Sequence, residues 1–157
     1  MVGFGYDSHR FGEGNKLIIG GIKIDSEFGV IAHSDGDVLI HSLVDALLGA
    51  AGLGDIGEHY PDNNIQYKNA DSQIFLKEVV SLLEQKKFFI ENIDATILLE
   101  TPKISAYKPL IKQNIAMLCN ISSEIVNIKA KSNEKMGFVG KSEGIVAYSI
   151  CQINKKL

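Results

Sequence analysis

Three side chains carry the clearest chemical signal in this sequence. Asp7 and His9 stand two residues apart in a strand-like segment, and His41 lies near the start of an apolar, helix-like segment. Residues two apart in a strand share a face and lie about 7 Å apart along the backbone, so Asp7 and His9 can converge on one ion. Three such ligands would leave a tetrahedral Zn²⁺ with one open position, as in catalytic zinc sites. A D-x-H pair also arises by chance, so the spacing alone leaves both interpretations open.

Asp45 follows His41 by four residues and would lie on the same side of a helix. A metal-bound histidine usually donates its second ring N–H to a carboxylate, a carbonyl or water. We therefore predict that Asp45 accepts this hydrogen bond from His41.

Two further clusters suit anionic ligands. Residues 33–36 (His-Ser-Asp-Gly) precede the helix-like segment, where free amides and the helix dipole favour a phosphate. Alternatively, Ser34 is only the helix cap and His33 a solvated loop residue. Residues 131–135 (Lys-Ser-Asn-Glu-Lys) offer cations, a hydroxyl and a carboxylate suited to Mg²⁺. A solvated turn of mixed charge would look the same.

Composition limits the possible classes of protein. With 157 residues and 45% hydrophobic content, the chain should form a single domain over residues 1–157. The net charge of -3, without a long basic run, argues against nucleic acid or an anionic membrane as a partner. No apolar run is long enough to span a membrane. Cys119 and Cys151 form no C-x-x-C pair, which argues against a disulfide scaffold or a cysteine zinc site. Since the N-terminus lacks a signal or transit pattern, we expect a cytoplasmic protein.

The elements that must position these residues follow from hydrophobic periodicity and from turn residues. Ser34 is the predicted N-cap of the first helix, with Asp37 in the capping-box position, and Asp71 caps the second. The alternation of strands and helices predicts an α+β fold in which helices cover one face of a sheet. The expected strands are 2–11, 17–24 (bent at Gly20 and Gly21), 88–100, 124–131 and 143–153; the expected helices are 35–51, 71–87 and 105–120; the expected loops are 25–32, 55–64 and 132–140.

Together, these segments resemble one enzyme family over nearly the whole chain. The matching segments are GYDSHRF (5–11), AHSDGDVLIHSLVDALLGAAGLGDIGEHYPD (32–62), ADS (70–72), TPKI (101–104) and KAKSNEKMGFVGKSEGI (129–145). They resemble the 2-C-methyl-D-erythritol 2,4-cyclodiphosphate synthase family of the non-mevalonate isoprenoid pathway. The long second segment is far more specific than a D-x-H pair.

The resemblance implies a lyase reaction. The 2-phosphate of 4-diphosphocytidyl-2-C-methyl-D-erythritol 2-phosphate would attack the β-phosphate of its own cytidine diphosphate and release CMP. Asp7, His9 and His41 would bind Zn²⁺, and Glu134 would bind a Mg²⁺ or Mn²⁺ ion on the diphosphate. His33 and Ser132 match the positions assigned to transition-state stabilisation. Two cations and oriented donors should supply most of the catalysis, because the reacting groups are both anions.

The resemblance also divides the substrate contacts between two regions. The metal-binding and methylerythritol side would comprise Asp7, Ser8, His9, His33, Ser34, Asp55, Ile56, Gly57, Tyr60, Pro61, Asp62, Asn63 and Asn64. The cytidine diphosphate side would comprise Leu99, Glu100, Thr101, Pro102, Lys103, Ile104, Ser105, Lys131, Ser132, Asn133 and Glu134.

The implied fold is an α/β sandwich with a four-stranded mixed sheet and helices on one face. Three copies would form a homotrimer with the sheets facing the threefold axis. Each active site would then combine the zinc ligands of one subunit with the nucleotide pocket of the next. An apolar cavity on the axis could hold an isoprenoid diphosphate, with Phe138 and Lys141 at matching positions.

Two other functions use the same features. A zinc-dependent phosphate-ester hydrolase would hold a water with the same three ligands, and its products would contain solvent oxygen. A trimeric small-molecule sensor on a similar sandwich would need no metal triad.

Overall fold

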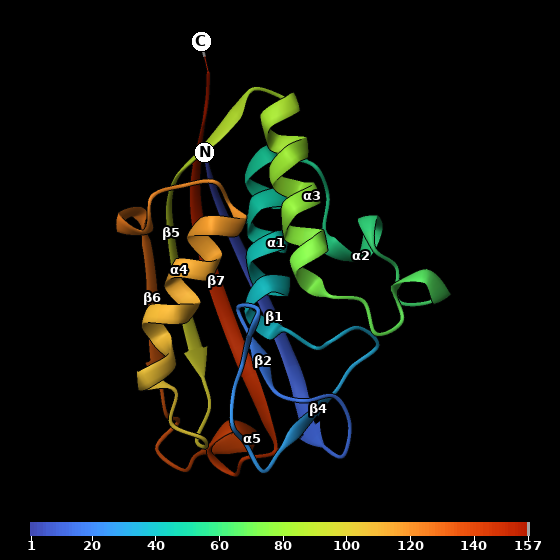
Figure 1. The fold of residues 1–157 in the computed structure, drawn as a ribbon, viewed down its shortest axis with the longest axis vertical. Coiled ribbons are helices and arrows are strands. Elements are labelled where there is room, and N and C mark those ends of the chain that lie inside the picture. Colours follow the sequence, from blue (N-terminus) through green and yellow to red (C-terminus); the bar gives the residue numbers. More distant parts are fainter. Residues whose placement is uncertain (157) are drawn as a thin grey trace.

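The computed structural model describes residues 1–156. A mixed β-sheet forms one layer of the fold, and helices form the other (Figure 1). Within those residues the sheet has five strands in the order β4-β1-β7-β5-β6. The strands are β1 (Val2–Gly12), β4 (Gly29–Ile31), β5 (Phe88–Leu98), β6 (Val126–Lys131) and β7 (Gly144–Lys155). β5 and β6 are parallel, and the other neighbours are antiparallel.

The sheet therefore has five strands where the family resemblance implied four. The additional strand, β4, lies in the expected loop 25–32 and pairs with only three residues of β1, Arg10 to Gly12. Its central residue, Val30, is fully buried and exchanges backbone hydrogen bonds with Asn15. A strand of three residues is too short to show alternation in the sequence. The predicted bend at Gly20 and Gly21 is confirmed, since it joins β2 (Ile18–Ile19) to β3 (Ile22–Lys23) as an antiparallel hairpin.

Three helices cover one face of the sheet: α1 (Val38–Ala51), α3 (Ser72–Gln85) and α4 (Lys108–Leu118) (Figure 1). α1 lies directly on β1 because β1 has glycine at two inward-facing positions. A Cβ atom on Gly5 would lie 1.8 Å from the Ser42 carbonyl oxygen, and one on Gly3 would lie 1.8 Å from the Ala46 carbonyl oxygen. Any other residue at these positions would push the helix off the strand.

The first helix begins later than predicted, and Ser34 is not its cap. Asp37 caps α1 by accepting from the Ile40 N–H at 3.0 Å, and the same buried carboxylate accepts from the N–H groups of Gly20 and Gly21. Ser and Asp are both common N-cap residues, so local spacing cannot show which of the two caps the helix. The contact of Asp37 with the distant hairpin is not visible in the local sequence. The predicted Asp71 cap of α3 is confirmed.

The remaining predicted loops contain short helices. α2 (Ile56–His59) lies in loop 55–64, and α5 (Gly137–Gly140) lies in loop 132–140. Single 3₁₀ turns occupy Ile65–Tyr67, Ser105–Tyr107 and Ser123–Ile125, and the second of these leads into α4. Cys119 and Cys151 are buried and free. No helix among residues 1–156 is long and apolar enough for a membrane crossing.

The two faces of the sheet differ in their surroundings. The face toward the helices carries fully buried residues such as Ile93, Ile97 and Ala147. On the other face, large apolar side chains of β1 and β7 remain exposed in the single chain: Val2, Phe4, Tyr6, Tyr148 and Ile150. The rings of Phe4 and Tyr6 both pack against Tyr148, so these side chains form a continuous apolar surface.

Candidate active site

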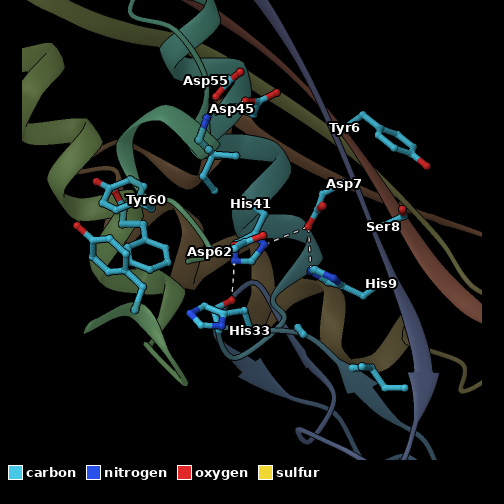
Figure 2. A pocket seen from close by; sticks show the side chains of 17 residues that line it. Tyr6, Asp7, Ser8, His9, His33, His41, Asp45, Asp55, Tyr60 and Asp62 are labelled. Carbon is cyan, nitrogen blue, oxygen red and sulfur yellow. Dashed lines mark hydrogen bonds and ion pairs between the residues drawn. The ribbon is translucent and has the colours of Figure 1, made fainter. Parts of the chain in front are cut away.

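Asp7, His9 and His41 converge at the end of α1 that lies against β1 (Figure 2). Asp7 Oδ2 lies 2.9 Å from His9 Nε2 and 3.1 Å from His41 Nδ1. One ligand atom from each residue lies within 4.8 Å of the other two, which is the spacing of a metal site. Within residues 1–156, this is the only group of three or more His, Cys, Asp or Glu side chains with that spacing. The predicted convergence is therefore present.

The donor set fits a divalent metal such as Zn²⁺. His9 Nε2 is buried and forms no hydrogen bond among the described residues, although Asp7 Oδ2 lies 2.9 Å away. A buried polar atom without a partner is unfavourable, and a bound ion would satisfy it. Burial opposes ionisation of Asp7, but the adjacent imidazoles of His41 and His9 lower its pKa to about 2. The carboxylate is thus ready to bind a cation at neutral pH.

The second nitrogen of His41 does not face Asp45, so that prediction is wrong. His41 Nε2 lies 2.8 Å from Ser72 Oγ and 3.2 Å from Ser34 Oγ. Asp45 lies one turn farther along α1, where its Oδ1 accepts from the Ile56 N–H at the start of α2 (Figure 2). Helical spacing placed the two residues on one side but could not show that Ser72, from another helix, comes closer.

A cavity of about 610 Å³ opens beside the triad. Its lining includes twelve of the predicted residues: Asp7, Ser8, His9, His33, Ser34, His41, Asp45, Asp55, Ile56, Gly57, Tyr60 and Asp62. Pro61, Asn63 and Asn64 do not line it, although His33 Nε2 lies 3.4 Å from the Asn64 carbonyl oxygen.

His33 and Ser34 line this cavity, but the N-terminus of α1 does not provide the predicted anion site. We expected free amides at the N-terminus of α1 to bind an anion there. Asp37 already accepts from the Ile40 N–H of the first turn and places a carboxylate at that terminus. No residue from 35 to 40 lines the cavity, so we expect an anion there to be bound by side chains or by a metal and not by this helix end.

One wall of the cavity is aromatic, and most of its residues carry no chemical signal that could be recognised in the sequence. The Tyr60 ring stacks on Phe75 with 4.3 Å between centroids, and Tyr67 packs edge-on against both. The Tyr60 hydroxyl donates to Glu78 at 2.9 Å. Phe75 and Tyr67 were not among the predicted site residues, because a helical Phe and a loop Tyr resemble ordinary core and surface residues.

The predicted nucleotide residues form a second cluster, at the carboxyl ends of β5 and β6. The Leu99 N–H donates to the Lys131 carbonyl, and the Asn133 N–H donates to Glu100 Oε2, both at 3.1 Å. Ser132 Oγ donates to Glu134 Oε1 at 3.1 Å. Parallel pairing brings the two segments together, as expected for strands whose carboxyl ends share one edge.

Not every member of this cluster can present its side chain to a ligand. Leu99 and Ile104 are buried in the core, so only their backbone groups are available. Thr101, Lys103, Ser105, Lys131 and Glu134 are exposed, and Pro102 is partly buried. Phe138 and Lys141, at α5, are exposed as well. None of these residues lines the cavity beside the triad in the same chain.

Comparison with known proteins places the chain in one family. The model of the YgbB family matches residues 1–154. The 2-C-methyl-D-erythritol 2,4-cyclodiphosphate synthase of Methylobacillus flagellatus is 51% identical over 154 residues, which are 98% of this chain and 96% of that protein. The enzyme of the same name from Chlorobaculum parvum is 49% identical over 155 residues, 99% of each chain.

Solved structures agree with the sequence comparison. The bifunctional IspDF from Campylobacter jejuni is 42% identical with a TM-score of 0.95, and the match covers 99% of this chain and 42% of that longer chain. IspF from Plasmodium falciparum, in a CDP complex, is 35% identical with a TM-score of 0.87 and coverage of 99% and 96%. The chain therefore belongs to the YgbB family, the family of the 2-C-methyl-D-erythritol 2,4-cyclodiphosphate synthases.

Proposed function

We propose that this protein converts 4-diphosphocytidyl-2-C-methyl-D-erythritol 2-phosphate into 2-C-methyl-D-erythritol 2,4-cyclodiphosphate and CMP, as a lyase of isoprenoid biosynthesis. An oxygen of the 2-phosphate forms a bond to the β-phosphorus. The bond from that phosphorus to the bridging oxygen breaks, and CMP leaves with this oxygen. The observation that carries the proposal is the convergence of Asp7, His9 and His41 beside a cavity, in a chain that matches named synthases end to end.

Asp7, His9 and His41 would hold Zn²⁺ through Oδ2, Nε2 and Nδ1. The bound ion would supply positive charge for phosphate oxygens and leave the fourth position for the substrate. The chain's own contribution is to hold the three ligands in place before the substrate binds. Partial burial of all three side chains keeps the site away from bulk water, which strengthens its attraction for a phosphate.

His33 and Ser132 are the proposed stabilisers of charge that develops on the transferred phosphoryl group. His33 lines the cavity next to the triad and is only weakly held, 3.4 Å from the Asn64 carbonyl, so it is free to turn toward a ligand. Ser132 carries a hydroxyl that can donate to a phosphate oxygen in place of Glu134. Asp55, Ile56, Gly57, Tyr60 and Asp62 would bind the methylerythritol group from the opposite wall.

The nucleotide would be bound by the cluster of residues 99–105 and 131–134 of a neighbouring subunit. A relative described as an IspF–CDP complex supports a cytidine nucleotide as the ligand. Glu134 would bind Mg²⁺ or Mn²⁺ together with the diphosphate. One protein carboxylate is enough for this role, because Mg²⁺ usually takes one or two carboxylates and completes its shell with water and phosphate oxygens.

A homotrimer with the sheets facing its axis would join the two half-sites. The exposed apolar surface of β1 and β7 supports this arrangement, because contiguous patches of this kind mark interfaces. Phe138 and Lys141, both exposed, would lie near the axial cavity and could contact an isoprenoid diphosphate there.

The activity is tested by incubating the purified protein with the nucleotide substrate and following CMP by phosphorus NMR, with and without a chelator. We expect CMP and the cyclic diphosphate in equal amounts, loss of activity with chelator, and no ¹⁸O in the products from H₂¹⁸O. Incorporation of ¹⁸O would instead indicate a hydrolase. Binding without turnover would indicate a sensor.

The assembly is tested separately by light scattering of the parent and of Phe4→Glu. We expect a trimer for the parent and dissociation for the variant, because a carboxylate would be buried in the interface. A parent protein that runs as a monomer and still turns over would refute the shared active site.

A further inference from the structure

We propose that Ser72 and Asp35 are positioning residues that fix His41 in the tautomer and orientation that metal binding requires. The proposal rests on the metal site proposed above. Ser72 is the first residue of α3 and is fully buried, and its Oγ lies 2.8 Å from His41 Nε2. Asp35, in the loop before α1, hydrogen-bonds the same hydroxyl. Neither residue lines the cavity, so the pair acts through His41 and does not touch the substrate.

The direction of each hydrogen bond follows from the chemistry of the groups. A carboxylate can only accept, so Ser72 uses its single hydroxyl hydrogen to donate to Asp35. Ser72 Oγ is then left as an acceptor toward His41, and the hydrogen of the neutral imidazole must lie on Nε2. On the opposite side of the ring, Nδ1 faces Asp7 Oδ2 at 3.1 Å and donates to it while no ion is bound. An ion bound between the two would take the place of that hydrogen, and the Nε2 hydrogen would stay directed at Ser72.

Ser34 is consistent with the same tautomer. Its Oγ lies 3.2 Å from His41 Nε2 and already accepts from the Gly36 N–H at 3.3 Å. It can serve as a second, longer acceptor for the Nε2 hydrogen. Among the described residues, a carboxylate fixes the hydroxyl hydrogen of Ser72 but not that of Ser34. The contact between Ser72 and Asp35 therefore determines that His41 Nε2 is the donor to Ser72.

Asp35 is itself held firmly, which makes the pair a rigid support. Its carboxylate accepts from the Ser72 N–H at 3.0 Å and from the Asp37 N–H at 3.1 Å. Its own N–H donates to the Ala70 carbonyl at 3.1 Å. The start of α3 and the loop before α1 are therefore joined behind His41, and the orientation of the imidazole depends on both.

The test measures zinc affinity by competition with a chromophoric chelator, for the parent, Ser72→Ala and the control Ser81→Ala. Ser81 is an exposed serine of the same helix, and its hydroxyl accepts a hydrogen bond from the Gln85 side chain. We expect zinc binding to weaken about 10- to 100-fold in Ser72→Ala, the usual effect of removing the partner of a ligand. Ser81→Ala should bind zinc like the parent.

A second measurement is made first on the parent protein, so its main result does not depend on whether a variant folds. Long-range ¹H–¹⁵N spectra of the metal-free parent report which nitrogens of His41 carry a hydrogen, and we expect a hydrogen on Nε2. In Ser72→Ala and Asp35→Ala, we expect a mixture of tautomers. An Nε2 without a hydrogen in the parent, or parental zinc affinity in Ser72→Ala, would overturn the positioning role alone. A parent protein that binds no zinc would instead refute the metal site, and this role with it.

Discussion

The contact between β1 and α1 determines the spacing of the proposed metal ligands, and Gly5→Ala tests this directly. Asp7 lies two residues after Gly5 on the same face of β1, and His41 directly precedes Ser42 on α1. A Cβ atom on residue 5 would lie 1.8 Å from the Ser42 carbonyl oxygen, where real Cβ atoms keep at least 3.0 Å. The strand and the helix must therefore separate by about 1.2 Å at this point.

The expected effect has two parts. Overpacking in a core costs about 1–3 kcal/mol, and we expect the upper end of that range because a helix carbonyl cannot rotate away. The displacement also moves His41 away from Asp7, whose ligand atoms are 3.1 Å apart. Misplacement of a catalytic group by about 1 Å can reduce the rate about 100-fold, so we expect a loss of this order in turnover together with weaker zinc binding.

Gly49→Ala is the matched control, because it makes the same chemical change on α1. A Cβ atom on Gly49 meets no atom within 4 Å. Alanine in a helix is favoured over glycine by about 0.5–1 kcal/mol, so this variant should be slightly more stable and fully active. Urea unfolding, zinc titration and CMP release are measured on both. If Gly5→Ala unfolds at the parental urea concentration and binds zinc normally, the close packing does not set the site.

Three further predictions concern the cap, the aromatic wall and the second cation. Asp37→Asn should lower the free energy of unfolding by about 1–3 kcal/mol, because an amide N–H would replace an acceptor of the Gly21 N–H. Burial raises the pKa of Asp37 to about 6, so protonation of this side chain stabilises the folded state at low pH, and that stabilisation is lost as the pH rises through 6. Asn cannot be protonated in this way, so the difference in free energy of unfolding between parent and variant, measured by urea titration, should grow from pH 7 to pH 4. Phe75→Ala should cost about 3–5 kcal/mol and raise KM, since Tyr60 loses its stacking partner; an unchanged KM would exclude a binding role for this wall. Glu134→Ala should lose turnover at limiting Mg²⁺ and regain part of it at high Mg²⁺, and full turnover at limiting Mg²⁺ would refute the second cation site.

The features predicted well from the sequence were those that depend on local periodicity. The alternation around Asp7 and His9 put both on one face of a strand, and the helix containing His41 was recognised from its apolar spacing. The hairpin at Gly20 and Gly21 and the cap at Asp71 also have local causes. The convergence of His41 with the strand was a hypothesis that the fold then satisfied.

The features predicted poorly depend on contacts between distant segments. The cap of α1 is Asp37 and not Ser34, because the carboxylate also accepts from a hairpin 16 to 17 residues earlier. The partner of His41 is Ser72 and not Asp45, because α3 packs beside α1. No spacing rule within one helix contains this information.

These two corrections share a physical cause that bears on the function. Asp35 and Asp37, only two residues apart, use their carboxylates to hold α3 and the hairpin of β2 and β3, respectively, against the start of α1. The segment that carries His41 is thus fixed from two sides, while the glycines of β1 bring it close to Asp7 from a third. A metal site assembled from two elements requires such support, since ligand spacing must be kept within a few tenths of an ångström. Within this segment, Asp35 and Asp37 therefore support the proposed metal site to which His41 contributes a ligand.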